Sequence, residues 1–579
     1  MDMINIKING APYSVPAGST ILEACRTIGM EIPTLCYMKG KNEIGACRIC
    51  MVEVVGARTL VAACVMPVNE GMEIITNSKR VMDARKRTIE LIMSNHNCSC
   101  LACDRSENCE LQTLARNFGV DFDAYTGAKT ETVLDESSPS IIRDGSKCIL
   151  CRRCVAACRE QTGVIGANHR GFDTTIGCAF ELNLADVSCV NCGQCIEACP
   201  VGALTERDQI DEVFAAINDP TKTVVVQTAP AVRAAIAEGF GKPIGTMGKG
   251  KMVAALRRLG FDKVFDTNFT ADLTIMEEGT ELIGRIKNGG TLPMITSCSP
   301  GWIKYCEHYF PDFLPNLSTC KSPQQMFGAC VKTWWAKRNN LDPKDIVSVS
   351  IMPCTAKKFE VGRDEMKENG EADVDYALTT RELVKMIKRA GLKWDSLPDE
   401  EFDSPLGEGT GAAVIFGATG GVMEAALRTA VDVLTNQENA EVEYKEVRGM
   451  DGIKEATYSV AGLTLNVAVA SGLQNAKKVL EAVRNGEKNY HFIEIMCCPG
   501  GCINGGGQPI QPNWVRETVD VKGLRAGVLY QEDKDLPERK SHHNSAVDII
   551  YKEYFETPNS HIAHEVLHTS YVDRSKTIK

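Results

Sequence analysis

Cysteines suited to metal binding gather near the end of the chain, in the stretch FIEIMCCPGGCINGGGQP at residues 492–509. It holds Cys497, Cys498 and Cys502 after a short apolar run. Glycine lets the backbone approach a bulky group closely, and it costs conformational entropy where nothing needs that approach. Cysteine at this density, without secretory features, indicates a metal site and not a disulfide. The bland alternative, a glycine-rich surface loop with incidental thiols, is disfavoured by the metal motifs upstream.

The strongest metal motif occurs twice between residues 141 and 210. Each copy reads C-x2-C-x2-C-x3-C, and the second ends in Cys-Pro, which is the spacing of bacterial two-cluster ferredoxins. In that fold the fourth cysteine of each run binds the cluster of the other run. We therefore predict two [4Fe–4S] clusters. One is assigned to Cys148, Cys151, Cys154 and Cys199, and the other to Cys189, Cys192, Cys195 and Cys158.

Two more ligand sets lie closer to the N-terminus. The first reads C-x10-C-x2-C-x13-C between strand-like segments, which favours a [2Fe–2S] cluster over zinc. The second reads H-x3-C-x2-C-x5-C after an amphipathic helix predicted over 79–95. Its spacing suits zinc and a [4Fe–4S] cluster equally, and its place between other cluster sites favours the cluster. The first set is Cys36, Cys47, Cys50 and Cys64, and the second is His96, Cys100, Cys103 and Cys109.

Composition limits the classes of function. The 579 residues carry a net charge of −11, which argues against a nucleic-acid partner and an anionic membrane surface. No signal peptide and no apolar run long enough to span a bilayer are visible, so we expect a cytoplasmic protein with no membrane partner. In a reducing compartment, 26 cysteines cannot form a disulfide framework.

The ligand sets divide the chain into a multi-domain α+β and α/β arrangement. The four cluster sites before residue 210 would form an electron-transfer path. The remaining residues should hold the active site at which that path ends. The predicted units are a β-grasp [2Fe–2S] ferredoxin domain at 1–80, a [4Fe–4S] domain with one histidine and three cysteine ligands at 81–120, a polar linker at 121–140, a two-[4Fe–4S] ferredoxin domain at 141–210, an α/β catalytic domain at 211–510 and a C-terminal segment at 511–579.

Short apolar strands followed by helical patterns indicate a mostly parallel sheet in 211–510. Three of them run into cysteine motifs at their carboxyl ends, where α/β folds place active sites. The predicted strand segments are TVVVQTAPAVR, DKVFDTNF, TLPMITSC, DIVSVSIMPC, GAAVIFGATGG, LNVAVASG and FIEIMCC.

The three cysteine motifs together resemble the signatures of [FeFe]-hydrogenases. They are TSCSPGW at 296–302, MPCTAKKFE at 352–360 and MCCPGGCINGGGQP at 496–509. The resemblance covers essentially the whole chain, with the cluster modules in the same order. It implies an α/β H-cluster domain that interconverts protons and electrons with H₂. The H-cluster of that family is a [4Fe–4S] cubane joined through one cysteine sulfur to a two-iron unit with CO, cyanide and azadithiolate ligands.

The resemblance also implies roles for individual residues. Cys354, Cys498 and Cys502 would bind the cubane, with Cys502 bridging to the two-iron unit. A second group would surround the two-iron unit: Lys357 at one cyanide, Ala229, Pro230 and the Ala231 N–H at the other, Gln324 at a CO, and Met352, Phe416 and Met496 as an apolar wall.

The first motif departs from the family pattern, which is TSCCP. By register Cys298 keeps the position that carries protons, and Ser299 takes the position of a cubane ligand. A serine alkoxide is harder to form than a thiolate and matches iron–sulfur chemistry less well. The alternatives are a shift of Cys298 to the iron and a role for the additional thiol Cys497.

A proton route is implied by the same resemblance. Glu278, Glu281 and Arg285 are spaced i, i+3 and i+7, on one face of a predicted helix. An acidic helix face is ordinarily a solvated one. Because the family's route runs from the first cysteine through Glu, Ser and Glu to Arg, we favour Cys298, Glu278, Ser318, Glu281 and Arg285.

Partners and rival functions complete the prediction. No GxGxxG unit or P-loop is present, so flavin or NAD chemistry would lie on another subunit. The expected partners are H₂, protons, ferredoxin, an NAD(H)-binding flavoprotein and small [2Fe–2S] subunits. The rivals are a sensory hydrogenase of low activity and a non-catalytic electron-transfer or cluster-assembly protein. The irregularly spaced histidines after residue 540 favour core or surface roles over a metal set.

Overall fold

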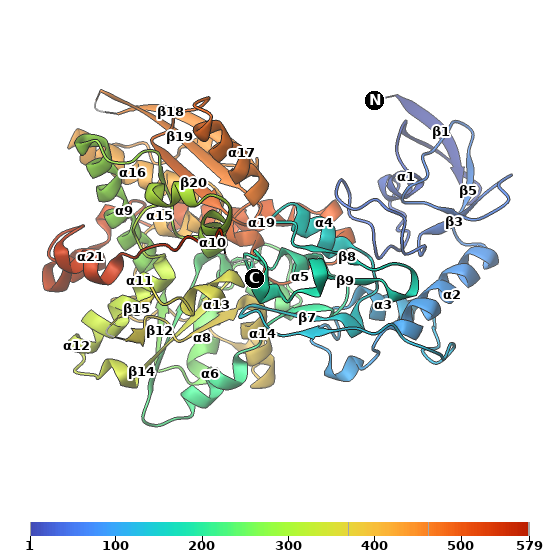
Figure 1. Cartoon of the computed structure of the whole chain (residues 1–579), viewed down its shortest axis with the longest axis horizontal. Coiled ribbons are helices and arrows are strands. Elements are labelled where there is room, and N and C mark those ends of the chain that lie inside the picture. Colours follow the sequence, from blue (N-terminus) through green and yellow to red (C-terminus); the bar gives the residue numbers. More distant parts are fainter. Residues whose placement is uncertain (1, 369, 461, 577–579) are drawn as a thin grey trace.

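The computed structural model describes residues 2–368, 370–460 and 462–576, and it begins with a β-grasp domain (Figure 1). The predicted Asn-Gly turn is present, with φ of 51° at Asn9 and 82° at Gly10. Thr20 caps the following helix in a capping box with Glu23. The sheet order is β2-β1-β5-β3-β4. Its elements are β1 (Met3–Ile8), β2 (Ala11–Pro16), α1 (Ile21–Thr27), β3 (Met51–Val54), β4 (Val61–Ala62) and β5 (Glu73–Ile75).

The next region carries the motif of one histidine and three cysteines and then the two ferredoxin runs. The predicted helix over 79–95 is α2 (Lys79–Asn95). The two runs bend alike: Leu150 and Asn191 have φ of 56° and 59°, and Arg152 and Gly193 have φ of 62° and 70°. Within 121–140, strand β6 pairs with β7. The other elements are α3 (Glu110–Asn117), β6 (Leu134–Asp135), β7 (Ile141–Asp144), α4 (Arg153–Arg159), β8 (Ile165–Asn168), β9 (Thr175–Cys178), α5 (Gln194–Ala198) and β10 (Leu204–Glu206).

Two small sheets organise the region from residue 211 to 510. The first is wholly parallel, with order β12-β11-β14-β17. The second, β13-β20-β19-β18, is parallel except for the β18–β19 hairpin. The strands are β11 (Thr223–Thr228), β12 (Lys263–Asp266), β13 (Met294–Ile295), β14 (Ile346–Met352), β17 (Tyr376–Thr379), β18 (Ile453–Val460), β19 (Leu463–Ser471) and β20 (Phe492–Met496).

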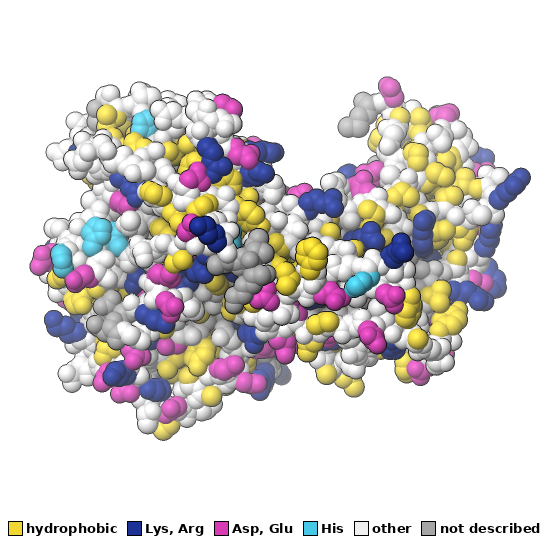
Figure 2. Space-filling view, in the orientation of Figure 1, with side chains coloured by type: hydrophobic (Ala, Val, Ile, Leu, Met, Phe, Trp, Pro, Cys, Tyr) yellow, Lys and Arg dark blue, Asp and Glu magenta, His cyan; other side chains and the backbone are white. Residues whose placement is uncertain are grey.

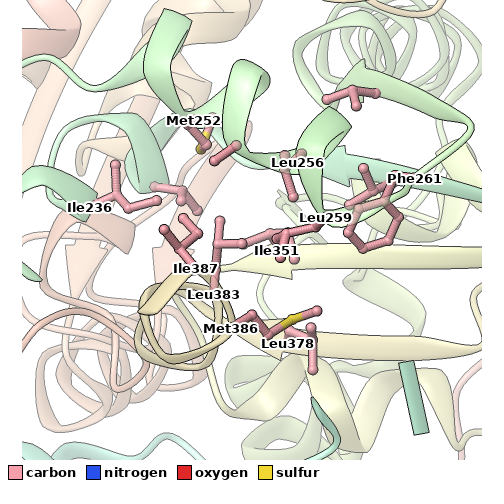
Figure 3. Packing of buried hydrophobic residues seen from close by; sticks show 14 of the residues in the cluster. Ile236, Met252, Leu256, Leu259, Phe261, Ile351, Leu378, Leu383, Met386 and Ile387 are labelled. Atoms are coloured by element: carbon pink, nitrogen blue, oxygen red, sulfur yellow. The ribbon is translucent and has the colours of Figure 1, made fainter. Parts of the chain in front are cut away.

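Helices cover both faces of each sheet. In β19, Val467 and Val469 face α9 and α16, while Ala468 and Ala470 face α10 and α17, because successive side chains point to opposite faces. Figure 3 shows the cluster on one face of the first sheet, where α8 and α14 pack on β14. The helices are α6 (Ile210–Ile217), α7 (Pro230–Arg233), α8 (Lys249–Leu259), α9 (Asn268–Asn288), α10 (Pro300–Tyr309), α11 (Pro323–Cys330), α13 (Ala356–Val361), α14 (Thr380–Arg389), α16 (Gly421–Thr435) and α17 (Leu473–Arg484).

The long helix α9 lies between the two sheets. Phe269 and Leu273 belong to the core beneath the first sheet, and Ala271 and Ile275 to the core beneath the second. This helix carries Glu278, so its position is fixed from both sides.

One strand prediction is wrong. GAAVIFGATGG is helical, as α15 (Gly411–Val414) and a 3₁₀ turn (Ile415–Gly417). The segment is buried on all sides, and a short apolar run has the same composition in a buried strand and in a buried helix.

The C-terminal segment packs against the catalytic region. Ala546, Val547 and Phe555 join the core that contains α9 and α11. None of the helices in the described residues is long and apolar enough to cross a membrane. The elements are α18 (Asn513–Thr518), α19 (Val521–Asp535), α20 (Ser545–Ile550) and α21 (His561–Leu567).

Candidate active site

The three cysteine motifs meet around one buried cavity. Strands β13, β14 and β20 end at it, and they deliver Cys298, Cys354 and Cys498 from distant parts of the sequence. Cys502 enters from the glycine-rich loop. The predicted site residues that line the cavity are Ala229, Pro230, Ala231, Cys298, Ser299, Gln324, Met352, Cys354, Lys357, Phe416, Met496, Cys498 and Cys502.

The thiols of this cavity suit a cationic iron group. Burial raises the pKa of Cys502 to about 12, and burial with the neighbouring Cys498 raises that of Cys354 further. Such thiols ionise when a metal cation compensates the charge. Thiolates are the ligands that iron–sulfur clusters prefer. The donor set therefore fits a cubane.

Lys357 supplies a positive charge at the cavity wall. Its ammonium donates to the carbonyl oxygen of Cys298 at 3.2 Å, to the Ser322 hydroxyl at 2.8 Å and to Glu360 at 2.8 Å. The Gln324 amide also donates to Glu360, at 3.0 Å. Glu360 is 2% exposed and orients both predicted residues. Glu360 closes the MPCTAKKFE motif without a predicted role, and its i+3 spacing from Lys357 was the available signal.

The opposite wall has the predicted apolar and backbone character. Pro230 begins α7, so the Ala231 N–H lies in the first turn, where no intrahelical acceptor exists. Met352, Phe416 and Met496 are at most 7% exposed. They belong to the two sheet cores and also line the cavity, so the core and site interpretations of these side chains are compatible.

The predicted proton-route residues form a chain from the cavity outwards. Glu278 is 3% exposed; its burial, together with the charge of Glu281, raises its pKa to about 8. The Ser318 hydroxyl contacts Glu278 and donates to Glu281 at 3.0 Å. Glu281 accepts from Arg285 at 2.6 Å, and this last pair is partly exposed. At the inner end, Glu278 lies close enough to Cys298 to raise the pKa of its thiol, after the larger effect of burial.

Residues with no function predicted from the sequence lie beside these proton-route residues. His568 lies 3.2 Å from Glu277 and 2.7 Å from the Thr319 hydroxyl. The backbone N–H of Thr319 donates a hydrogen bond to Glu281. Figure 2 shows histidines gathered over α21. His542 lies elsewhere, 3.3 Å from Asp432, so the C-terminal histidines do not form one metal set in the described structure.

The two ferredoxin runs are cross-connected as the motif predicts. Cys148, Cys151, Cys154 and Cys199 line one pocket together. The thiols of Cys158, Cys189 and Cys192 lie close enough to Cys195 to raise its pKa, in addition to the larger effect of burial.

The cysteines of the first N-terminal set lie in close pairs, and the second set contains a buried, unpaired histidine nitrogen. Cys50 Sγ lies 3.3 Å from Cys64 Sγ, and the Cys47 N–H points to Cys36 Sγ at 3.5 Å. His96 is buried, and its Nδ1 has no hydrogen-bond partner in the described structure. An unpaired buried ring nitrogen is a suitable metal ligand.

Both N-terminal sets touch the first ferredoxin site. The Asn42 amide donates to the carbonyl oxygens of Cys36 and Cys151, at 2.7 and 3.0 Å. A Cβ on Gly202 would lie 2.6 Å from Cys103 Sγ, so the set that contains His96 also reaches the turn beyond Cys199.

The glycine-rich loop packs closely between the active site and the ferredoxin region. A Cβ on Gly505 would lie 2.1 Å from the Pro353 carbonyl oxygen, and one on Gly506 would lie 2.3 Å from that of Cys192. Cys498 and Cys502 precede these glycines. The glycines thus serve close backbone contact with neighbouring loops, in addition to closure around the cavity.

Domain families match along the chain in the predicted order. Residues 1–79 match a 2Fe-2S iron-sulfur cluster binding domain, 85–123 the NADH-ubiquinone oxidoreductase-G iron-sulfur binding region, and 147–203 a 4Fe-4S dicluster domain. Residues 222–506 match the C-terminal domain of the iron only hydrogenase large subunit, and 519–574 the iron hydrogenase small subunit.

Similar proteins cover the full length. The NADP-reducing hydrogenase subunit HndD of Solidesulfovibrio fructosivorans is 49% identical, over 100% of both chains. Iron hydrogenase 1 of Clostridium pasteurianum is 46% identical, over 98% of this chain and 100% of its own. The Xenopus tropicalis cytosolic Fe-S cluster assembly factor narfl is 30% identical, over 68% of this chain and 86% of its own.

A solved structure gives the same result. A variant of the apo [FeFe]-hydrogenase HydA1 from Chlamydomonas reinhardtii is 43% identical, with a TM-score of 0.57 over 63% of this chain and 99% of that chain. Because two full-length relatives at 46 and 49% identity are hydrogenases, the more distant assembly factors do not change the assignment. The chain belongs to the [FeFe]-hydrogenase family.

Proposed function

We propose that this chain interconverts H₂ with protons and electrons, which it exchanges with partner proteins. One observation supports this most. The buried cavity that gathers Cys354, Cys498 and Cys502 is also lined by Cys298, the inner end of the predicted proton route. The H-cluster, when bound there, supplies the two-electron chemistry between protons and H₂. The protein supplies ligands, positive charge, an apolar wall and paths for protons and electrons.

Cys354, Cys498 and Cys502 would hold the cubane, and Ser299 stands at the fourth position by register. The Lys357 ammonium would bind an anionic ligand such as cyanide, because it is buried at the wall and held in place by Glu360. The Ala231 N–H would bind a second such ligand. The apolar side chains of Met352, Phe416 and Met496 would exclude water from the cavity.

Protons would move between Cys298 and the surface through Glu278, Ser318, Glu281 and Arg285. Glu278 suits a carrier because its raised pKa, about 8, allows both gain and loss of a proton near neutral pH. The Ser318 hydroxyl can accept from one carboxyl group and donate to the next. Arg285 would hold the outer carboxylate, Glu281, where it meets solvent.

Electrons would travel through one [2Fe–2S] and three accessory [4Fe–4S] clusters. Both N-terminal sites contact the first ferredoxin site, which supports two entry points that converge before the active site. The name of the HndD relative, an NADP-reducing hydrogenase subunit, supports a complex with nucleotide-linked partners. A flavoprotein, small [2Fe–2S] subunits and ferredoxin are the candidate partners.

Infrared spectroscopy of the maturated protein tests the assignment. Bands from CO and cyanide are expected, together with H₂ evolution from a reduced dye. A maturated preparation that contains its clusters and shows neither those bands nor H₂ evolution would favour the non-catalytic electron-transfer or assembly alternative. A low turnover with normal bands would favour the sensory alternative.

A further inference from the structure

The active-site cubane needs a fourth protein ligand, and the register of the first motif offers only a hydroxyl. Iron–sulfur clusters are held by soft thiolates, with imidazole as an occasional replacement. The serine oxygen is a hard donor that gives up its proton far less readily than a thiol does. A chain that binds its other clusters with cysteine and histidine would thus hold its active site by an unusual donor, Ser299.

Ser299 already accepts a hydrogen bond from the backbone. It is the residue before Pro300, where α10 begins, and its Oγ accepts the Cys497 backbone N–H at 3.3 Å. A hydroxyl in this position can keep its proton and still satisfy a buried backbone donor.

The Cys497 thiol offers the missing donor in the same place. It is 5% exposed and lines the cavity together with Ser299, Cys354 and Cys498. Its sulfur lies close to the thiols of Cys498 and Cys192, and all three residues line the cavity.

The backbone of the first motif makes room for this sulfur. A Cβ on Gly301 would lie 2.8 Å from Cys497 Sγ, which is closer than real Cβ atoms approach. The segment that carries the hydroxyl at Ser299 therefore also leaves the space in which the Cys497 sulfur lies.

We infer that Cys497, and not Ser299, is the fourth thiolate of the active-site [4Fe–4S] cluster. One Fe–S bond forms at Cys497 Sγ, and the thiol proton leaves to solvent, while Ser299 keeps its hydroxyl proton. The inference rests on the proposed function only for the presence of the cubane. It also brings a cubane ligand into contact with Cys192, a predicted ligand of the neighbouring accessory cluster, which shortens the path for electrons.

The test uses the full-length chain produced anaerobically in a host without hydrogenase maturases, so that no two-iron unit is present. Iron content and low-temperature EPR of the reduced protein are measured for the wild type, Ser299→Ala, Cys497→Ala and the double variant S299C/C497A. Cys306→Ala is the matched control, because Cys306 is a fully buried thiol of the same core that does not line the cavity.

We expect Cys497→Ala to lose one [4Fe–4S] cluster, about four irons per chain. Ser299→Ala and Cys306→Ala should keep the wild-type iron content, and S299C/C497A should regain the lost cluster because a thiolate returns at the register position. An unchanged [2Fe–2S] EPR signal would show that Cys497→Ala still folds.

Retention of all iron by Cys497→Ala would overturn the inference, as would loss of a cluster in Ser299→Ala. None of these measurements depends on CO or cyanide bands. The inference about Cys497 can therefore be wrong while the infrared test supports the proposed function, and it can be right while the infrared test contradicts that function.

Discussion

Glu278 is the buried carboxyl group of the proposed proton route, and its replacement gives a direct kinetic test of that route. Gln at this position keeps the shape of the side chain and cannot carry a proton. We expect Glu278→Gln to lower H₂ evolution by about 100-fold or more, as removal of a proton-transfer group does. Iron content and the CO and cyanide bands should stay unchanged. An active Glu278→Gln enzyme would place the proton route elsewhere.

The raised pKa of Glu278 also predicts a pH-dependent cost in stability. The folded protein holds this proton up to about pH 8, whereas the unfolded chain releases it near the ordinary value of 4.5. Because the folded state binds more protons between these values, stability falls as pH rises through that window. Thermal melts of Glu278→Gln against the wild type should show a gain that grows from pH 5 to pH 8 and then levels off. A constant difference would contradict the raised pKa.

Replacement of His96 tests whether the predicted site of one histidine and three cysteines holds a cluster or zinc. Replacement of the neutral imidazole by a thiolate adds one negative charge, which stabilises the oxidised cluster. We expect His96→Cys to keep four irons and to lower the midpoint potential of one cluster in an EPR-monitored redox titration. A zinc site would give no such signal, and metal analysis would find zinc instead.

The grouping of cysteines in the ferredoxin region was predictable from the sequence, because the spacing of that motif is characteristic. Cys199 was assigned across to Cys148 from the motif, and the structure brings them together. The position of Cys497 was not predictable, because its distance from Cys192 depends on packing between two domains. Glu360 was predictable only in part: its i+3 spacing from Lys357 was a local signal, whereas its contact with Gln324 joins separate segments.

At the scale of elements, periodicity was reliable where one face is exposed and failed where none is. The helix over 79–95 was predicted at its observed bounds. The buried segment that forms α15 has no polar face, so its period could not separate helix from strand. The position of α9 between the two sheets also could not be predicted from the sequence, because it follows from the strand order and not from the local sequence.

The glycine-rich loop makes a prediction at this scale. A methyl group on Gly506 would lie within 2.3 Å of the Cys192 carbonyl oxygen and cannot be accommodated without a backbone shift. Gly506→Ala should destabilise the protein by about 1–3 kcal/mol, as overpacking does. Gly527→Ala is the control, since a Cβ there meets open space on α19. Equal denaturation midpoints for the two variants would show that the loop is not tightly held.

The whole molecule depends on segments that join distant domains. Figure 1 shows the N-terminal domain at one end of the molecule, apart from the two sheets of the catalytic region. The C-terminal segment contacts this domain: the Asn513 amide donates a hydrogen bond to the Tyr37 carbonyl oxygen at 2.9 Å. Glu517 accepts from the Lys39 backbone N–H at 2.9 Å and pairs with Arg26.

We therefore predict that Glu517 helps to dock the [2Fe–2S] domain. Its side chain is only 10% exposed, so its loss leaves Arg26 with the more exposed Glu31 alone. We expect Glu517→Ala to increase hydrogen exchange over residues 26–42 and to slow electron transfer that enters through the [2Fe–2S] cluster. H₂ evolution from a small dye that reduces later clusters should persist. Glu553→Ala, which removes an exposed ion pair with Arg338 far from this contact, should change neither exchange in that segment nor electron entry. Unchanged exchange in Glu517→Ala would mean that α18 does not hold the domain, and that Asn42 and its neighbours suffice.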